Sequence, residues 1–346
     1  MAIDLFDTRT MINMFQQLPT TRTFFRDTFF ARNVTRSMTE AVDIDVIKGK
    51  RRVAPYVHPT VGSRTVERPG FTTNSMKPPL VAPDMITTAQ DMLKRAAGEA
   101  IYGAMSPDER AAAQLGKDLG TMDDLITRRE ELQARDAILD GKLYVTLDDA
   151  TGVTYSATID FGRNANNTVV LSGADLWDAT TGDPLQKFRD WRRQIAQNTG
   201  LTANICLMGA SAADAFIKNA KVLDYLNKFN VNRGVLEPAE VPQGMSFLGR
   251  VGGVDCYEYN EWYLDPADDT EKPIIPAKQI LMACTEARTD RLYGCICDPV
   301  RGSFALDRVP FSWIQNKPSA RFVSLSSRPM MVPTQVDAFL KATVLA

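Results

Sequence analysis

The first ninety residues of this chain lack the means to fold by themselves. Residues 1–40 contain six phenylalanines among basic residues, with no long apolar stripe at helical spacing. Residues 41–86 alternate apolar and polar side chains as strands do, but six prolines interrupt them, and proline gives no donor to a sheet. An isolated two-stranded hairpin is marginal in water. This part of the chain must therefore bury its apolar side chains against another subunit or against the body of its own domain.

Charge is divided unevenly between this segment and the rest of the chain. Residues 1–85 hold 12 Lys and Arg against 8 Asp and Glu, a net charge of +4, and because the whole chain carries −2, the remaining 261 residues carry −6. A basic extended segment can meet the acidic part of a neighbouring copy as readily as its own, and such head-to-tail contacts build rings and shells. A chance asymmetry of solvated charge explains the same numbers, so charge alone decides nothing.

We predict that contacts with a neighbouring subunit lie in the first 86 residues. The candidates are aromatic and basic side chains, which supply apolar area and charge to an interface. On this hypothesis, deletion of residues 1–36 leaves a soluble protein that forms no closed assembly. The candidate contact residues are Phe24, Phe25, Arg26, Phe29, Phe30, Arg32, Arg36, Arg51, Arg52, Tyr56, His58, Arg64, Arg68, Phe71 and Lys77.

A long helix is predicted over about residues 106–141. Ser106 is a suitable N-cap, Pro107 suits the first helical position and Glu109 completes a capping box, while Gly141 is a stop signal. At ~1.5 Å per residue the helix would be ~50 Å long and would form the spine of a flat subunit.

One face of this helix is predicted to be apolar and the other solvated, because adjacent carboxylates usually mark a solvated surface. Two glycines, Gly116 and Gly120, are places where the helix could bend. The apolar face holds Met122, Leu125, Ile126, Leu132, Ile138 and Leu139, and the charged face holds Asp123, Asp124, Arg128, Arg129, Glu130 and Glu131.

The rest of the chain mixes strands and helices. Strands and turns are predicted over residues 142–171, and an α/β region follows over 184–298. Its elements are a helix at 184–198, a strand at 203–208, a helix at 211–229 and strands at 251–259 and 279–284. Apolar strands at 311–314, 322–325 and 330–332 are predicted to complete the spine domain, which makes the α/β region an insertion.

The sequence assembles no catalytic, cofactor-binding or metal site. Its single histidine, His58, lies in the extended segment, which disfavours a catalytic triad or a two-histidine metal site. Cys295 and Cys297 would share one face of a strand, but zinc takes about four ligands and no second close pair occurs. Gly249 to Gly253 precedes a strand and is interpreted as a turn.

No apolar run approaches the ~20 residues that span a bilayer, and residues 1–19 lack the pattern of a secretory signal. We therefore expect no membrane partner, and a chain that stays in the cytoplasm with its five cysteines reduced.

A series of short motifs runs in order along nearly the whole chain. They are Phe24-Phe25-Arg26, residues 55–59, Phe71, Lys77-Pro78-Pro79, Gly141-Lys142, residues 160–163, Asn166-Asn167, residues 293–296, and the stretch from Trp313 through Pro329-Met330 to Phe339. In this order the segments resemble the major capsid proteins of tailed bacteriophages, specifically the family of the phage lambda major head protein.

The resemblance implies an α+β, HK97-like capsid fold. Residues 1–40 would be the N-arm, 41–86 the E-loop, 87–184 and 299–346 the P-domain with its spine helix, and 185–298 an inserted A-domain. It also implies hexamers and pentamers that close into an icosahedral head around double-stranded DNA. Scaffolding protein and portal would act during assembly, and a decoration protein would bind at three-fold positions as the shell expands.

Three further expectations accompany the resemblance. Contact with DNA would be weak and nonspecific, since the net charge is only −2. The protein would belong to the virion capsid after assembly in the cytoplasm of the bacterial host. Some related phages join Lys and Asn side chains covalently, and Lys77 and Asn316 are the positions to inspect, but reliance on decoration proteins disfavours that cross-link.

Two other functions stay open at this point. A cellular nanocompartment shell, which encloses cargo proteins, would share the fold. An α/β hydrolase built on the middle region is less favoured, because its only histidine lies in the extended segment.

Overall fold

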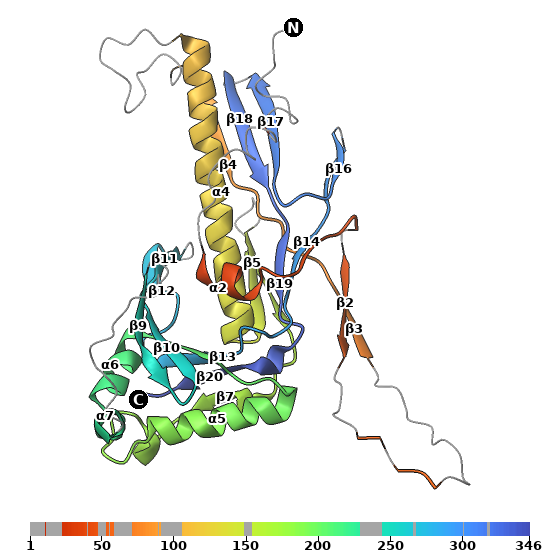
Figure 1. The fold of residues 1–346 in the computed structure, drawn as a ribbon. Coiled ribbons are helices and arrows are strands. Elements are labelled where there is room, and N and C mark those ends of the chain that lie inside the picture. Colours follow the sequence, from red (N-terminus) through yellow and green to blue (C-terminus); the bar gives the residue numbers. More distant parts are fainter. Residues whose placement is uncertain are drawn as a thin grey trace.

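A helix of 33 residues, α4 (Pro107–Leu139), runs along one side of the molecule, with a mixed β-sheet at its C-terminal end (Figure 1). The computed structural model describes residues 11, 23–39, 41–47, 53–54, 56–58, 71–88, 90, 106–148, 154–228, 244–265, 268–299, 301–316 and 319–346. These residues form both helices and strands, with long runs of strands uninterrupted by an α-helix, so the fold is α+β, as predicted.

The part of the fold that contains α4 also contains one short helix and many strands. They are α2 (Phe24–Phe29), β1 (Val34–Arg36), β2 (Val42–Ile47), β3 (Phe71–Met76), β4 (Asp84–Thr88), β5 (Lys142–Asp148), β6 (Thr154–Asp160), β14 (Asp290–Tyr293), β15 (Ile296–Asp298), β16 (Gly302–Phe304), β17 (Val309–Asn316), β18 (Ser319–Ser326) and β19 (Pro329–Val332). One sheet has the order β17-β18-β4 and another has β1-β14-β19, with β1 parallel to β14. The predicted two-stranded excursion is present as the antiparallel pair β2–β3, which projects away from the rest of the chain (Figure 1).

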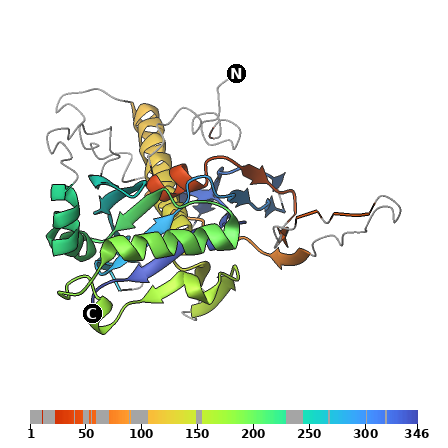
Figure 2. The ribbon, with the colours of Figure 1, turned by 60° about the horizontal axis from the view of Figure 1, so that its bottom comes forward.

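The other main part of the fold is a six-stranded sheet with helices packed on it. Its strands are β7 (Thr168–Val170), β8 (Ile205–Met208), β9 (Met245–Val251), β10 (Val254–Tyr259), β13 (Gln279–Ala283) and β20 (Phe339–Thr343), and its helices are α5 (Pro184–Thr199), α6 (Ala210–Lys218) and α7 (Ala220–Lys228). A separate hairpin is formed by β11 (Trp262–Asp265) and β12 (Thr270–Pro273). Short 3-10 helices lie at Ala165–Asn167, Gly173–Asp175 and Val336–Ala338. The strand order is β7-β20-β13-β8-β10-β9. Helix α5 lies across this sheet (Figure 2), and its buried Phe188, Trp191 and Ile195 belong to the core there.

The start of α4 has the predicted capping box. The Glu109 N–H donates to Ser106 Oγ at 3.3 Å, and the Ser106 N–H donates to the Glu109 carboxylate at 2.7 Å. Pro107 occupies the first helical position. The helix continues without a break through Gly116 and Gly120, because packing against strands along its length outweighs the ~1 kcal/mol that a helical glycine costs.

The end of α4 is held by an arginine from a later loop. Arg163 donates from Nη1 to the Ile138 carbonyl at 2.9 Å and from Nη2 to the Leu139 carbonyl at 2.6 Å. Such carbonyls have no partner inside the helix. Gly141 follows with φ +66°, and a Cβ built there would meet Arg163 Cβ at 2.9 Å. Gly141 therefore ends the helix for two reasons: its backbone adopts a left-handed conformation, and Arg163 approaches it too closely for a side chain.

The predicted division of α4 into an apolar and a solvated face is wrong in part. Asp123, Glu130 and Glu131 are buried, whereas Leu125 is 46% exposed. The reason is that α2 and β19 cover a side of the helix that the apolar stripe does not mark. Met122 and Ile126 do lie in an apolar core, together with Leu115, Leu119, Val323 and Leu325.

The C-terminal segment divides differently from the prediction. Strand β19 lies beside α4, but β20 enters the six-stranded sheet between β13 and β7. Conversely β14, which the sequence placed in the α/β region, pairs with β1 and β19 near α4. Phe339, Leu340 and Ala342 are all fully buried, and a strand apolar on both faces suits the interior of a covered sheet.

Two elements of the α/β region also differ in detail. The predicted helix 211–229 is two helices, because Asn219 between them is extended and donates from its buried side chain to the Trp177 carbonyl at 3.1 Å. The predicted strand 251–259 is the hairpin β9–β10, which turns at Gly252 and Gly253 with φ values of +59° and +82°. The turn predicted at Gly249 to Gly253 is confirmed at Gly252 and Gly253, whereas residues 249–251 belong to β9.

Gly141→Ala is expected to lower the free energy of unfolding by about 1–3 kcal/mol, because alanine is strained at this φ and its Cβ would overlap Arg163. Gly120→Ala is the matched control. It lies inside α4 with nothing within 4 Å of an added Cβ, so it should raise stability by about 0.5–1 kcal/mol. Urea denaturation followed by circular dichroism measures both changes, and changes of the same sign would contradict the assignment.

Candidate functional site

The N-terminal helix α2 is capped by a carboxylate from α4. The two oxygens of Glu131 accept hydrogen bonds from the Phe25 N–H at 2.8 Å and from the Arg26 N–H at 2.9 Å. These N–H groups open α2 and have no partner within it, and a negative charge is favourable at a helix N-terminus. Glu131 also accepts from the Tyr259 hydroxyl at 3.4 Å. A single buried carboxylate thus ties α2, α4 and β10 together.

The rings of α2 lie inside their own chain. Phe25 and Phe30 are 0% exposed and Phe29 is 2% exposed. Phe25 meets Tyr259 edge-on with ring centres 5.5 Å apart, and Phe29 meets Phe339 edge-on at 5.7 Å. The predicted contact with a neighbouring subunit is therefore corrected for these three residues, because their apolar surface is already covered by α4 and the six-stranded sheet.

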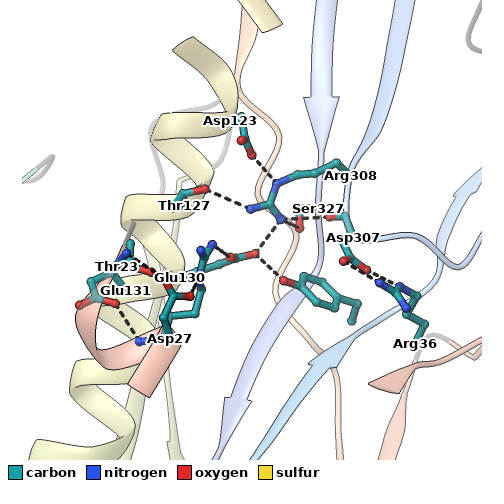
Figure 3. A network of polar contacts seen from close by, with 12 residues as sticks. Thr23, Asp27, Arg36, Asp123, Thr127, Glu130, Glu131, Asp307, Arg308 and Ser327 are labelled. Atoms are coloured by element: carbon teal, nitrogen blue, oxygen red, sulfur yellow. Dashed lines mark hydrogen bonds and ion pairs between the residues drawn. The ribbon is translucent and has the colours of Figure 1, made fainter. Parts of the chain in front are cut away.

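A charged network joins α2 to α4 and the C-terminal strands (Figure 3). Arg308, which directly precedes β17, donates from Nε to Asp123 at 2.9 Å and from Nη1 to Glu130 at 2.6 Å. Glu130 also accepts from Arg26 Nη1 at 3.1 Å and from the Tyr293 hydroxyl at 3.0 Å. Arg26 therefore contacts its own chain here, where the sequence predicted a contact with a neighbour.

Hydroxyl groups complete this network. Arg308 also donates to Ser327 Oγ at 3.1 Å and to Thr127 Oγ1 at 3.4 Å, and both hydroxyls are buried. Arg308 itself is only 8% exposed. Buried charges are tolerated when they are paired and hydrogen-bonded in this way.

A second arginine of the N-terminal segment forms an exposed pair. Arg36, at the end of β1, donates from Nε to Asp307 at 2.5 Å and from Nη2 to the same carboxylate at 2.9 Å. The pair sits one residue before Arg308, so β1 is attached next to the buried network. An exposed pair of this kind contributes little to stability.

The pKa values of two adjacent glutamates of α4 are shifted in opposite directions. Burial raises the pKa of Glu130, but the charges and hydrogen bonds of Arg308 and Arg26 outweigh it, so its pKa is lowered overall. Burial dominates at Glu131 and raises its pKa, although the Phe25 and Arg26 N–H groups oppose the shift. The Glu130 contribution to stability is therefore present at neutral pH and lost as pH falls through its folded pKa.

The remaining predicted contact residues fall into three groups. Arg32, Tyr56, His58 and Lys77 are exposed. Phe24 is half-buried against the core around Tyr259, and Phe71 lies in β3. Arg51, Arg52, Arg64 and Arg68 lie outside the described residues.

Sequence reasoning missed the acidic side of this network. Asp123, Thr127 and Glu130 stand at positions i, i+4 and i+7 of α4, so they share one face. That spacing was the available signal, but this face of the helix was interpreted as solvated.

Within the described residues no group of three or more His, Cys, Asp or Glu could hold a metal ion. In the same part of the chain, no helix is long and apolar enough to cross a membrane.

Comparisons with known proteins agree over nearly the whole length. The sequence matches the family described as phage major capsid protein E over residues 7–344. It is 27% identical to the major capsid protein of Escherichia phage N15, over 92% of each chain, and 26% identical to that of Escherichia phage lambda, again over 92% of each. It is 28% identical to the major capsid protein of Enterobacteria phage P21, over 98% of this chain and 99% of the other.

Solved structures show the same fold. A crystal structure described as that of a prophage capsid protein from Escherichia coli CFT073 aligns with a TM-score of 0.69 and 21% identity, over 98% of this chain and 99% of the other. A phage-related protein from Bordetella bronchiseptica aligns with a TM-score of 0.53 and 11% identity, over 96% of each.

Arg308→Ala is expected to lower the free energy of unfolding by about 3–5 kcal/mol, because it leaves Asp123 and Glu130 buried without their shared cation. Arg36→Ala is the matched control and should cost no more than about 1 kcal/mol, since its pair is exposed. Urea denaturation measures both. Equal losses would show that the buried network does not carry the stability assigned to it.

Deletion of residues 1–36 is now expected to give a chain that does not fold, which reverses the expectation from sequence. It removes three fully buried rings, and each buried aromatic contributes about 3–5 kcal/mol, against a typical total stability of about 5–15 kcal/mol. Yield of soluble protein and a cooperative thermal transition are the measurements. A soluble, cooperatively folded truncation would contradict this result.

Asp136→Asn is expected to stabilise the protein at pH 7 but not at pH 4. Burial raises the pKa of Asp136 to about 6, opposed by Arg135, so its charged form destabilises the folded state as pH rises through that value. The gain should reach about 1–3 kcal/mol at neutral pH. Thermal midpoints across the pH range test this, and an equal gain at pH 4 and pH 7 would contradict it.

Proposed function

Because this chain belongs to the phage major capsid protein E family, and is a structural protein of the head shell of a tailed phage rather than an enzyme, we propose how its copies assemble. They form hexamers and pentamers that close into an icosahedral head around double-stranded DNA. The match over residues 7–344 carries this proposal. Its relatives in phages N15, P21 and lambda are major capsid proteins.

We assign the segments by analogy with HK97-like shells. Residues 1–40 act as the N-arm, 41–86 as the E-loop, and 87–184 with 299–346 as the P-domain around α4, while 185–298 form the A-domain. The sheet pairings support one refinement: β20 belongs with the A-domain sheet, and β14 with the strands beside α4. The N-arm is anchored through Arg26 and Glu131, so its role is to fix the start of the E-loop.

The E-loop is proposed to lie on a neighbouring subunit. Val53 and Tyr56 are at least 90% exposed, and such apolar surface is costly in water. Residues 48–68 carry six basic residues against one acidic residue. Arg32, His58, Phe71 and Lys77 stay candidates for the same contact, as do the arginines of this stretch.

A complementary surface is present on the other side of the molecule. Trp262 and Leu264, on one face of the β11–β12 hairpin, are each 58% exposed. Residues 261–273 carry five acidic residues against Lys272. Both views place β2–β3 and this hairpin on opposite sides (Figures 1 and 2), which is the arrangement that a head-to-tail ring requires. We therefore propose the hairpin as the E-loop acceptor.

Other partners are proposed only from the family resemblance given by the sequence. They are a scaffolding protein and a portal during assembly in the host cytoplasm, and a decoration protein at three-fold positions. Contact with packaged DNA is weak, since the net charge of −2 supplies no broad basic footprint. Lys77 and Asn316 are both exposed, but we propose no covalent bond between them, and a ladder of covalent oligomers from boiled shells would contradict this.

The nanocompartment alternative is less supported than a phage head. Its discriminating observation is genetic: terminase and portal reading frames beside this one indicate a phage, and a cargo protein beside it indicates a nanocompartment. The hydrolase alternative is abandoned, because the family is structural and His58 is exposed in the projecting segment.

Charge reversal tests the proposed E-loop contact. Arg51→Glu with Arg52→Glu is expected to lower the yield of closed shells on the order of tenfold, which corresponds to ~1.4 kcal/mol of lost contact free energy. Adding Asp268→Lys with Glu271→Lys should restore the yield, because opposite charges face each other again. Sedimentation and electron microscopy of the purified protein measure it.

This experiment distinguishes a failure of the proposed assembly from a failure of the proposed acceptor hairpin. If the wild-type protein forms no shells, rings or capsomers, the assembly itself is contradicted. If the first variant assembles at the normal yield, or the second pair restores nothing, only the acceptor hairpin is contradicted.

A further inference from the structure

Two of the five cysteine thiols stand together near a surface hairpin. Cys295 connects β14 to β15 and is 1% exposed, whereas Cys297 in β15 is exposed. Their Sγ atoms are 3.6 Å apart, and Cys297 Sγ lies 3.3 Å from Ser303 Oγ on β16. The assembly proposed above assigns neither thiol a role.

We propose that Cys295 and Cys297 form a thiol–disulfide exchange site that reacts with small-molecule disulfides. Cys297 is attacked first because reagents can reach it, and Cys295 then closes the pair. The nearness of the second sulfur turns what would be a lasting adduct into an internal disulfide.

The chemistry balances in two steps. Cys297 loses its proton, and the thiolate attacks one sulfur of R–S–S–R, so that a mixed disulfide forms and one RS⁻ leaves. Cys295 then loses its proton and attacks the Cys297 sulfur, expelling the second RS⁻. Two protein thiols are oxidised to one disulfide by two electrons, and the small disulfide is reduced to two thiols.

The local geometry allows this closure and also makes it reversible. A disulfide has its sulfurs ~2.05 Å apart, so the two side chains must rotate to bring the sulfurs ~1.5 Å closer. Residues two apart in an extended strand have their Cα atoms ~6.6 Å apart, at the upper end of the range that a disulfide spans. A bond held at that limit is readily reduced, as expected of an exchange site and not of a structural bridge.

A second thiol pair in the same chain provides an internal comparison. Cys206 and Cys256 are register partners on the neighbouring strands β8 and β10, and both are 0% exposed. Burial raises the pKa of Cys206 well above its ordinary value, and no reagent reaches it in the folded protein. Cys284 is buried as well. Accessibility, and not the number of sulfurs, therefore distinguishes the pair at 295 and 297.

Burial also sets the order of events within the reactive pair. It raises the pKa of the Cys295 thiol, helped by the neighbouring Cys297, so Cys295 is a poor first nucleophile. Once Cys297 carries a leaving group, the nearness of the two sulfurs compensates for the small fraction of Cys295 thiolate.

The site lies where the β2–β3 excursion leaves the body of the protein. The Cys295 N–H donates to the Thr39 carbonyl at 3.5 Å, just before β2. Gly294 lies against Pro78, just after β3, since a Cβ built on Gly294 would meet Pro78 Cγ at 3.2 Å. The disulfide therefore forms beside the two points where the β2–β3 pair joins the rest of the protein.

An aromatic disulfide that releases a coloured thiolate tests the proposal on the folded, full-length protein. The wild type should release two coloured thiolates per chain rapidly and retain none, with a mass lower by two hydrogens. Cys295→Ser should release one and retain one, because nothing closes the pair. Cys297→Ser should react at least about tenfold more slowly than the wild type, since its remaining thiols are buried.

Cys206→Ala is the control and should behave as the wild type does. The proposal is overturned if the wild type retains an aryl thiolate on Cys297. It is equally overturned if Cys297→Ser reacts as fast as the wild type, or if peptide mapping finds the new disulfide between Cys206 and Cys256.

Discussion

The rest of the structure depends on one buried ion cluster, in which Arg308 is held between Asp123 and Glu130 of α4. Charges removed from water cost several kcal/mol each unless their partners are well placed. The cluster meets that cost with Thr127, Ser327 and Tyr293 hydroxyls and with Arg26 from the N-terminal helix. Because each of these groups comes from a different segment, the cluster is satisfied only when α2, α4, β14 and the C-terminal strands are all in place. It therefore specifies one arrangement, which an apolar core of the same size would do less strictly.

The neighbouring carboxylate Glu131 shows how the N-terminal residues use this arrangement. A six-residue helix is too short to be stable alone. Helix α2 is held because the Glu131 carboxylate accepts hydrogen bonds from its first N–H groups, and because Phe25, Phe29 and Phe30 pack in the core with α4 and β20. The same segment then passes through β1 into the β2–β3 excursion. Rigid attachment at one end and exposed apolar side chains beyond it suit a segment that must reach a second copy.

Local signals predicted the elements that local chemistry decides. The capping box at Ser106 and the stop at Gly141 gave both ends of α4, and the predicted helix at residues 184–198 agrees with α5. Burial was harder to predict from the sequence, because Asp123 and Glu130 are buried beside Arg308, which lies far along the chain. The aromatic residues of α2 were rightly expected to be covered, but nothing nearby in the sequence showed that their own chain covers them. The place of β20 was likewise decided by a pairing with distant strands.

The pairings β1–β14 and β20–β7 join strands that lie far apart in the chain. During synthesis, α4 leaves the ribosome long before β14, Arg308 and β20 exist, so the nascent helix carries carboxylates and apolar surface with no partner. Contacts of such long sequence separation form late and slowly. A chain interrupted before residue 339 lacks β20, the strand that joins β7 to the rest of the six-stranded sheet. Its projecting β2–β3 pair would be attached to an unfinished body. Only nearly finished chains are therefore expected to acquire the geometry with which they can join a growing shell.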